Sequence, residues 1–136
     1  YDRVDDSVCA VRSALEEGIL SGAGKALAEI SVTDLIVEAT SEEQLAAMKI
    51  IDGALQAPLT QILENAGLCV TNIYNGGTPE GHGYNLKTGE KGNLIQMGVI
   101  DPLKVTRSAF QNAVSVAVTI LSTNAIITMA RSYDTK

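Results

Sequence analysis

Residues 98–108 read Gly-Val-Ile-Asp-Pro-Leu-Lys-Val-Thr-Arg-Ser, and this is the most specific stretch of the chain. An aspartate followed by a proline is typical of a helix start, because the carboxylate can cap the first amides and proline needs no donor there. We therefore predict a long helix with Asp101 as its N-cap and Pro102 at its first position. Small side chains that permit close helix–helix approach follow, namely Ser108, Ala109, Ala113, Ser115 and Ala117.

The spacing of apolar residues predicts further helices upstream. The first has apolar residues at steps of four, three, four and four, at Val4, Val8, Val11, Leu15 and Ile19. After a turn at residues 21–24, a second helix runs through Leu27 and Ile30, while residues 35–37 fit either a helix or a strand. A third helix begins at Ser41, whose hydroxyl can cap a first turn of two acids and an amide.

Two features then limit this third helix and the elements after it. Pro58 should break or kink the helix, which restarts and ends at the C-cap sequence of residues 65–67. Residues 84–86 and 93–95, with a turn around residues 88–89, indicate a small β-hairpin. Residues 125–129 are β-prone and predict a terminal strand. The fold class is therefore mainly α, a helical bundle with a small β-hairpin and a terminal strand.

The composition narrows the function classes. The net charge of -6 disfavours a nonspecific nucleic-acid role, but backbone amides and a metal ion can still hold an anionic nucleotide. The two cysteines match no metal-ligand spacing, and His82 is the single histidine, so a zinc site or a histidine-based triad is disfavoured. Polar residues interrupt the apolar stretch 110–130, which favours a buried helix of a large assembly over a membrane span.

Four segments of the sequence are distinctive in order and spacing. They are residues 3–6 with a helix ending at residues 16–18, residues 22–24 followed by 26–27, residues 83–85 followed by 92–93, and residues 98–108. In this order and spacing they resemble group I chaperonins, the GroEL/Hsp60 family. The resemblance implies that residues 1–17 are the end of an intermediate domain and its helix. It also implies that residues 18–136 are the C-terminal half of the equatorial ATP-binding domain. The chain begins Tyr1-Asp2-Arg3, so we expect a fragment or a processed product.

The same resemblance implies the site residues. Asp6 matches the catalytic aspartate, which positions the attacking water beside Mg²⁺ and the γ-phosphate. The residues expected against the base and ribose are Gly22, Ala23, Gly24, Asn85, Leu86, Val99 and Asp101. Glu17 and Arg107 match an ion pair that joins the intermediate domain to the equatorial domain.

Structural alternatives stand beside these roles. Asp6 could cap a helix, Asn85 could form a turn, Asp101 could be only an N-cap, and the ion pair could be two solvated charges. Ala23 and Leu86 depart from the family pattern, as does Lys87. Lys25 suggests a phosphate-binding loop of the Gly-x-x-x-x-Gly-Lys type, but the glycine spacing fails and Ala26 is not Ser or Thr.

The implied function is that of an ATP-dependent chaperonin that assists protein folding and refolding. ATP and Mg²⁺ are the expected cofactors, with the metal ligands mostly outside this sequence, which lacks the family's Gly-Asp-Gly-Thr-Thr phosphate loop. The expected partners are other chaperonin subunits in a homo-oligomeric ring, together with a co-chaperonin and unfolded proteins that bind through an apical domain. No nucleic acid or membrane is expected as a partner.

The fragment by itself is expected to be inactive and to self-associate through apolar helix faces. The expected location is the bacterial-type cytoplasm or an organellar matrix. The alternative is a non-hydrolysing chaperonin-like assembly module.

Overall fold

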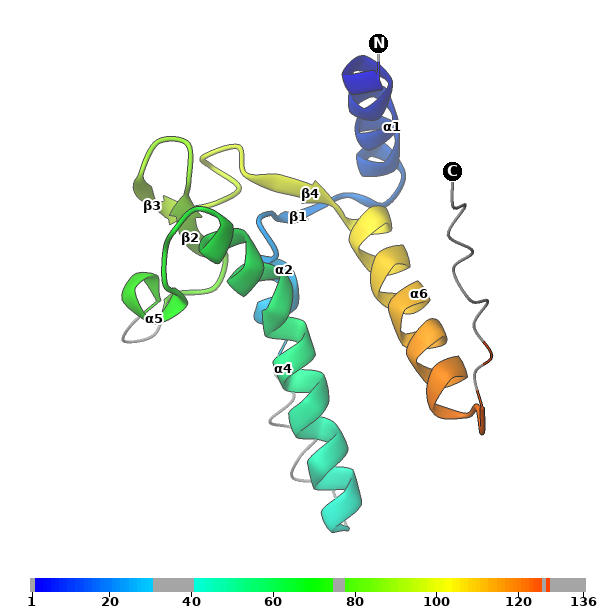
Figure 1. Cartoon of the computed structure of the whole chain (residues 1–136). Coiled ribbons are helices and arrows are strands. Elements are labelled where there is room, and N and C mark those ends of the chain that lie inside the picture. The colour runs from blue at the N-terminus through cyan, green and yellow to red at the C-terminus, as the bar shows by residue number, and fades with distance from the viewer. Residues whose placement is uncertain (1, 31–40, 75–77, 126, 128–136) are drawn as a thin grey trace, which may run out of the picture.

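The computed structural model describes residues 2–30, 41–74, 78–125 and 127, and within them the fold is mainly helical, as predicted. The helices are α1 (Asp2–Glu17), α2 (Lys25–Ala28), α4 (Glu42–Asn65), α5 (Val70–Ile73) and α6 (Leu103–Leu121), and the strands are β1 (Ile19–Ser21), β2 (His82–Asn85), β3 (Glu90–Asn93) and β4 (Ile100–Pro102). Figure 1 shows β1 and β4 joining a part built from α1 and α6 to a part built from α2, α4, α5 and the β2–β3 hairpin.

The expected hairpin is confirmed, with strands about two residues earlier than predicted. β2 and β3 pair antiparallel, with His82 opposite Asn93 and Asn85 opposite Glu90. A four-residue turn, residues 86–89, therefore closes the hairpin. The segment 35–37 lies outside the described residues, and the terminal strand expected over residues 125–129 lies largely outside them.

The small sheet formed by β1 and β4 was not predicted from the sequence. These strands pair antiparallel, with Leu20 opposite Asp101 and Ser21 opposite Ile100. We had expected Ile19 on the face of the first helix, but α1 ends at Glu17 and Ile19 begins β1. Pairing with β4 satisfies the backbone groups of this three-residue strand, which could not be stable alone.

The same pairing corrects the predicted start of the last helix. Asp101 is not the N-cap of α6, because it lies within β4 in the ladder with β1. Pro102 takes the N-cap position with extended backbone angles (φ -67°, ψ 129°), and α6 begins at Leu103. The Leu103 amide donates to the Gly18 carbonyl at 3.1 Å, so the chain leaving α1 partners the first amide of α6.

Helix α4 begins as predicted. The Gln44 amide donates to Ser41 Oγ at 3.3 Å, which confirms the cap. The predicted break and restart at Pro58 is wrong, because α4 is a single helix through that residue. Proline removes the hydrogen bond to the carbonyl of Ala54, but Ala54 is exposed and water can reach it. Burial of the apolar face around Pro58 offsets the lost bond.

The predicted C-terminus of α4 is also confirmed, at Gly67. This residue adopts a left-handed conformation (φ 73°), and its amide donates to the Glu64 carbonyl at 2.9 Å. The Leu68 amide reaches back to the Leu63 carbonyl at 2.9 Å. The two bonds are those of a Schellman motif, which satisfies carbonyls left unpaired at a helix end.

The core lies along α4. The buried apolar residues are Leu55, Leu59, Leu63 and Leu94. The first three are spaced by four residues, so they share one face of α4, and α2 packs against this helix. Gln56 Nε2 adds a hydrogen bond of 3.0 Å to the Ala28 carbonyl. The core therefore fixes α2, and the turn immediately before it, on α4.

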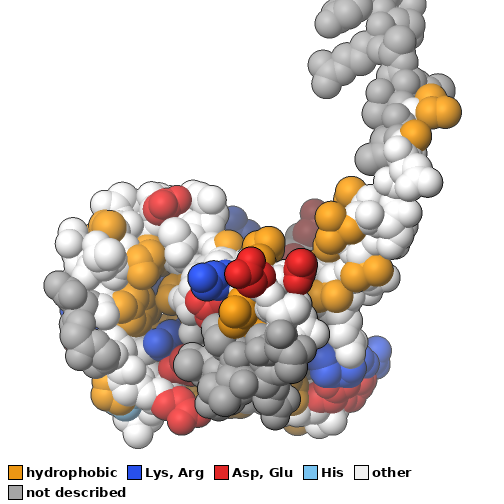
Figure 2. Space-filling model, turned by 90° about the horizontal axis from the view of Figure 1, so that it is seen from below, with side chains coloured by type: hydrophobic (Ala, Val, Ile, Leu, Met, Phe, Trp, Pro, Cys, Tyr) orange, Lys and Arg blue, Asp and Glu red, His pale blue; other side chains and the backbone are white. Residues whose placement is uncertain are grey.

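Helices α1 and α6 pack against each other, yet neither contains a buried residue. Leu15 of α1 and Leu121 of α6 are 83% and 85% exposed. Figure 2 shows hydrophobic side chains at the surface of the arm that leads to the C-terminal residues. Within the described residues, no helix has both the length and the apolar character needed to cross a membrane.

Candidate functional site

The structure brings the turn of residues 22–24 onto the start of β4. The Gly22 amide donates to the Val99 carbonyl at 2.9 Å. A Cβ atom on Gly22 would lie 3.0 Å from the carbonyl carbon of Val99 and from the amide nitrogen of Ile100. Gly22 is therefore required by the close approach of the protein's own backbone. The resemblance had placed Gly22 against the base and ribose of a nucleotide.

The other two residues of the turn have left-handed backbones. A Cβ atom on Gly24 (φ 73°) would lie 2.7 Å from the Leu59 amide nitrogen, so this glycine lets the turn rest on α4. Ala23, which departs from the family pattern, has φ 58°. Among the residues that the structure describes, it is the one non-glycine residue with a positive φ. A left-handed conformation costs a residue with a Cβ about 1–2 kcal/mol. The surrounding contacts hold the turn in its glycine-like shape despite the alanine.

Val99 lies beside this turn directly before β4, and Asp101 lies within β4. Both are partly buried, and burial raises the pKa of the Asp101 carboxyl. A partly dehydrated carboxylate gains from hydroxyl donors, and an adjacent apolar side chain can cover a flat ring. The turn and β4 therefore present the kinds of group that a base and a sugar require.

Asn85 and Leu86 lie at the turn end of the hairpin. Asn85 Oδ1 accepts hydrogen bonds from the amides of Lys87 at 3.0 Å and Thr88 at 3.4 Å. The turn-forming role of Asn85 is thus present in the structure, and its carbonyl oxygen is used locally. Leu86 is 39% exposed.

The base of the hairpin is connected to β4 through Leu94. The Leu94 amide donates to the Gly81 carbonyl at 2.9 Å, and the Val99 amide donates to the Leu94 carbonyl at 2.8 Å. The Leu94 side chain is fully buried, and a Cβ atom on Gly83 would lie 2.8 Å from its Cδ1 atom. The buried residue Leu94 therefore links the base of the hairpin to Val99 through two backbone hydrogen bonds.

Asp6 is exposed on α1 and is separated from the glycine turn. It lies eleven positions before Glu17, which corresponds to about 16 Å along the helix axis. Figure 1 shows the N-terminal end of α1 pointing away from β1 and β4. The structure therefore does not bring Asp6 to the turn. Because α1 begins at Asp2, Asp6 lies in the second turn, and the alternative role as a helix cap is wrong.

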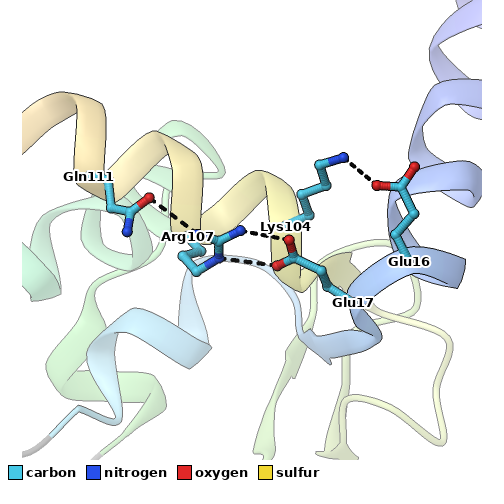
Figure 3. A network of polar contacts seen from close by, with 5 residues as sticks. All are labelled: Glu16, Glu17, Lys104, Arg107 and Gln111. Carbon is cyan, nitrogen blue, oxygen red and sulfur yellow. Dashed lines mark hydrogen bonds and ion pairs between the residues drawn. The ribbon is translucent and has the colours of Figure 1, made fainter.

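Glu17 and Arg107 meet where α1 and α6 adjoin (Figure 3). Arg107 donates from Nε to Glu17 Oε2 at 3.1 Å and from Nη2 to Oε1 at 2.6 Å, and from Nη1 to Gln111 Oε1 at 3.3 Å. Lys104 pairs with Glu16 alongside. Hydrogen bonding to Arg107 lowers the pKa of Glu17, and the same bonds raise the pKa of Arg107. The two-point geometry fixes the orientation of the guanidinium group.

A buried charge pair near the turn was missed in the sequence. Lys25 is only 8% exposed, and its Nζ atom lies 3.4 Å from Glu29 Oε1. We had considered Lys25 only as a phosphate ligand. The available signal was the spacing of Lys25 and Glu29, because oppositely charged residues four positions apart on a helix lie on one face.

The described residues gather no metal site at the turn. No three His, Cys, Asp or Glu side chains among them lie together as a metal site requires. A cavity of about 270 Å³ lies between α5 and the hairpin, and one of about 440 Å³ lies where α4 meets α5. Val99 and Asp101 beside the turn suit a base and a sugar. The described residues around them do not form a group of side chains that could hold a metal ion.

The fold and site define a mainly helical domain in which a glycine-containing turn rests on Val99, directly before the short strand that carries Asp101. Residues 1–131 match the TCP-1/cpn60 chaperonin family. The match covers nearly the whole chain, so the chain belongs to that family. Its role is therefore that of a chaperonin. Members of the family are generally ATPases that bind ATP and Mg²⁺ and assemble with other chaperonin subunits.

Proposed function

We propose that the chain is the C-terminal part of the equatorial domain of a group I chaperonin, residues 18–136, preceded by the end of the intermediate domain, residues 1–17. In this proposal it supplies the base and ribose side of the ATP site together with the catalytic aspartate. The observation that carries it is the contact of Gly22 with Val99, next to the pairing of Leu20 with Asp101 in the β1–β4 ladder. That contact joins two segments about 80 residues apart in the sequence.

Each neighbouring group has a proposed role. Val99 covers one face of the adenine, and Asp101 accepts hydrogen bonds from the ribose hydroxyls, which stabilise its partly dehydrated carboxylate. The side-chain oxygen of Asn85, Oδ1, already accepts a hydrogen bond within the turn. The contact from this residue to the base therefore comes from its side-chain NH2 group, which donates. The phosphates and most Mg²⁺ ligands are held by residues outside this sequence.

Asp6 acts only after α1 moves toward the turn. Its proposed task is to orient the water that attacks the γ-phosphate, for which a carboxylate is suited as a hydrogen-bond acceptor. The Glu17–Arg107 pair lies at the end of α1 nearest the turn, where such a movement would pivot. In the full-length protein, the ATPase cycle drives folding and refolding of unfolded proteins in a subunit ring, with a co-chaperonin, in the cytoplasm or an organellar matrix.

The test is an ATPase assay on the full-length protein with Asp6→Asn. We expect hydrolysis to fall by at least about 100-fold while ATP binding is retained, because this substitution removes a group needed only in the chemical step. The matched control is Asp52→Asn, an exposed aspartate of α4, which should leave the rate unchanged. The chain of residues 1–136 alone should not hydrolyse ATP. An unchanged rate in the Asp6 variant would refute the proposed role.

A non-hydrolysing assembly module is the second candidate. The observations that favour it are the left-handed alanine in the turn and the local use of the Asn85 carbonyl oxygen. A full-length protein that assembles but shows no Mg²⁺-dependent ATPase activity would select this candidate.

A further inference from the structure

Lys25 is an almost fully buried charge directly after the glycine turn. Its side chain is 10% exposed, and that of its partner Glu29 is 20% exposed. The Nζ atom lies 3.4 Å from Glu29 Oε1 and 4.9 Å from the centroid of the Tyr74 ring, at the end of α5. A buried lysine is rare without such partners, and a cation over an aromatic face is favourable.

Glu29 extends this contact to the hairpin. Its Oε1 atom accepts a hydrogen bond of 2.7 Å from the Gly81 amide, immediately before β2. The same oxygen thus partners both the Lys25 ammonium and a backbone amide 52 residues away in the sequence. An amide bonded to a charged acceptor is held more strongly than one bonded to a neutral acceptor.

Tyr74 is the second partner of Lys25. Its ring centroid lies 4.9 Å from the Lys25 Nζ atom, and burial raises the pKa of Tyr74. Through Glu29, the end of α2 is bonded to Gly81, the residue directly before the strand that carries Asn85.

These contacts join two parts of the molecule that the two small sheets leave separate. The turn of residues 22–24 belongs with the β1–β4 sheet, and Asn85 belongs to the β2–β3 sheet. Leu94 relates the base of the hairpin to Val99. Lys91 of β3 also donates to the Ile73 carbonyl of α5 at 2.9 Å. The contacts from α2 add fixed points directly beside the turn of residues 22–24.

We propose that Lys25 and Glu29 form a clamp that fixes the β2–β3 hairpin, and with it Asn85, relative to the turn of residues 22–24. Both are positioning residues, since neither need touch the nucleotide. The part of this inference that concerns ATP rests on the proposed function. The part that concerns the position of the hairpin does not.

Hydrogen exchange of the full-length protein without nucleotide tests the clamp itself. In Lys25→Met and Glu29→Ala, amides 81–85 should exchange at least about tenfold faster, because opening of the hairpin becomes easier. Glu29→Gln keeps an acceptor for the Gly81 amide and should give a smaller change. The amide of Leu20, in the separate β1–β4 ladder, should be unaffected and reports that the fold is intact. Unchanged exchange at 81–85 in these variants would overturn the clamp, whatever the protein does with ATP.

Steady-state kinetics test the consequence for the site. In Lys25→Met, the KM for ATP should rise about tenfold with kcat unchanged, the pattern for loss of binding without loss of chemistry. Lys25→Arg keeps the cation and should recover most of the affinity, whereas Lys49→Met, an exposed lysine of α4, should have no effect. An unchanged KM in Lys25→Met would overturn the positioning role. A wild-type protein without ATP binding would instead refute the proposed function, and hydrogen exchange would still decide the clamp.

Discussion

Gly22 and Gly24 are needed for packing before any ligand is considered. The first lies against the backbone of Val99, and the second lies against the backbone of Leu59. Both contacts are with main-chain atoms, which cannot move aside as a flexible side chain can. The turn is therefore a junction between β4 and α4, and a nucleotide site at this position uses a shape that the fold already requires.

A substitution at Asp101 should change the stability of the fold and the binding of ATP in opposite directions. Burial raises its pKa, so the charged form is less favourable in the folded chain than in the unfolded chain. Its contribution to stability is therefore greatest below pH 3.8 and is lost as the pH rises through the raised folded-state pKa. At pH 7 we expect Asp101→Asn to raise the melting temperature slightly while weakening ATP binding about tenfold, since a charged acceptor is lost.

Thermal melts at pH 7 and pH 3, with ATP binding measured by calorimetry, check both halves of this expectation. The stability gain should disappear at pH 3, where the wild-type carboxyl is itself protonated. A variant that loses stability at pH 7 would contradict the burial argument, and one with unchanged ATP affinity would contradict the ribose contact.

At the scale of elements, two glycines with the same backbone conformation lie at helix ends with different surroundings. Gly67 follows the C-terminal end of α4, and Gly24 precedes α2. Gly67 and Gly24 both have φ 73°, but a Cβ atom on Gly67 meets nothing within 4 Å, whereas one on Gly24 meets the Leu59 backbone at 2.7 Å. Gly67→Ala should therefore cost only the conformational strain, about 1–2 kcal/mol. Gly24→Ala should cost about 1–3 kcal/mol more, because α2 must shift away from α4.

Urea denaturation of the two variants measures this difference directly. Equal losses of unfolding free energy would mean that the α2–α4 contact yields without strain. That result would contradict the rigid junction described above.

The junction of α1 and α6 should weaken in acid. The pKa of Glu17 is lowered by its hydrogen bonds to Arg107, so the pair contributes stability above pH 4.5 and loses it as the pH falls through the lowered folded-state value. Both side chains are open to solvent, so the contribution is small and decreases with salt. Glu17→Gln should lower the melting temperature slightly at pH 7 and have no effect near pH 3.

Arg107→Lys is the informative companion to this variant. It keeps the charge but loses the two-point contact with the carboxylate, so it should lose most of the pair's contribution. Melting curves recorded from pH 3 to pH 7 at low and high salt check both variants. A constant difference across that pH range would show that Glu17 acts through packing.

At the scale of the whole molecule, the apolar faces of α1 and α6 predict self-association of the chain of residues 1–136. Val11, Leu15 and Leu121 are 60%, 83% and 85% exposed, and exposed apolar patches of this kind favour contact with a second apolar surface. Light scattering should show an apparent mass that rises with concentration. Leu15→Lys should reduce the rise, whereas Ile50→Lys, at a 72% exposed position of α4, should not. A monomer at all concentrations would contradict the prediction.

The sequence by itself determined where the three long helices lie, and the family. Ser41 and Gly67 mark the two ends of α4, and the apolar spacing marks the faces of α1 and α4, because capping and helix periodicity act over three or four residues. The motif at residues 98–108 is likewise one continuous stretch, so it can be recognised without knowledge of the fold. Pro58 and Asp101 show where local rules failed, since α4 continues through the first and β4 contains the second.

Only the tertiary structure decided the contacts that build the site. The ladder of β1 with β4 and the bond from the Gly81 amide to Glu29 join residues 52 to 83 positions apart. Such contacts must offset the entropy of closing a long loop. No local pattern around Lys25 or Asp101 contains that information, because their partners are selected by the core along α4 and by the pairing of β1 with β4.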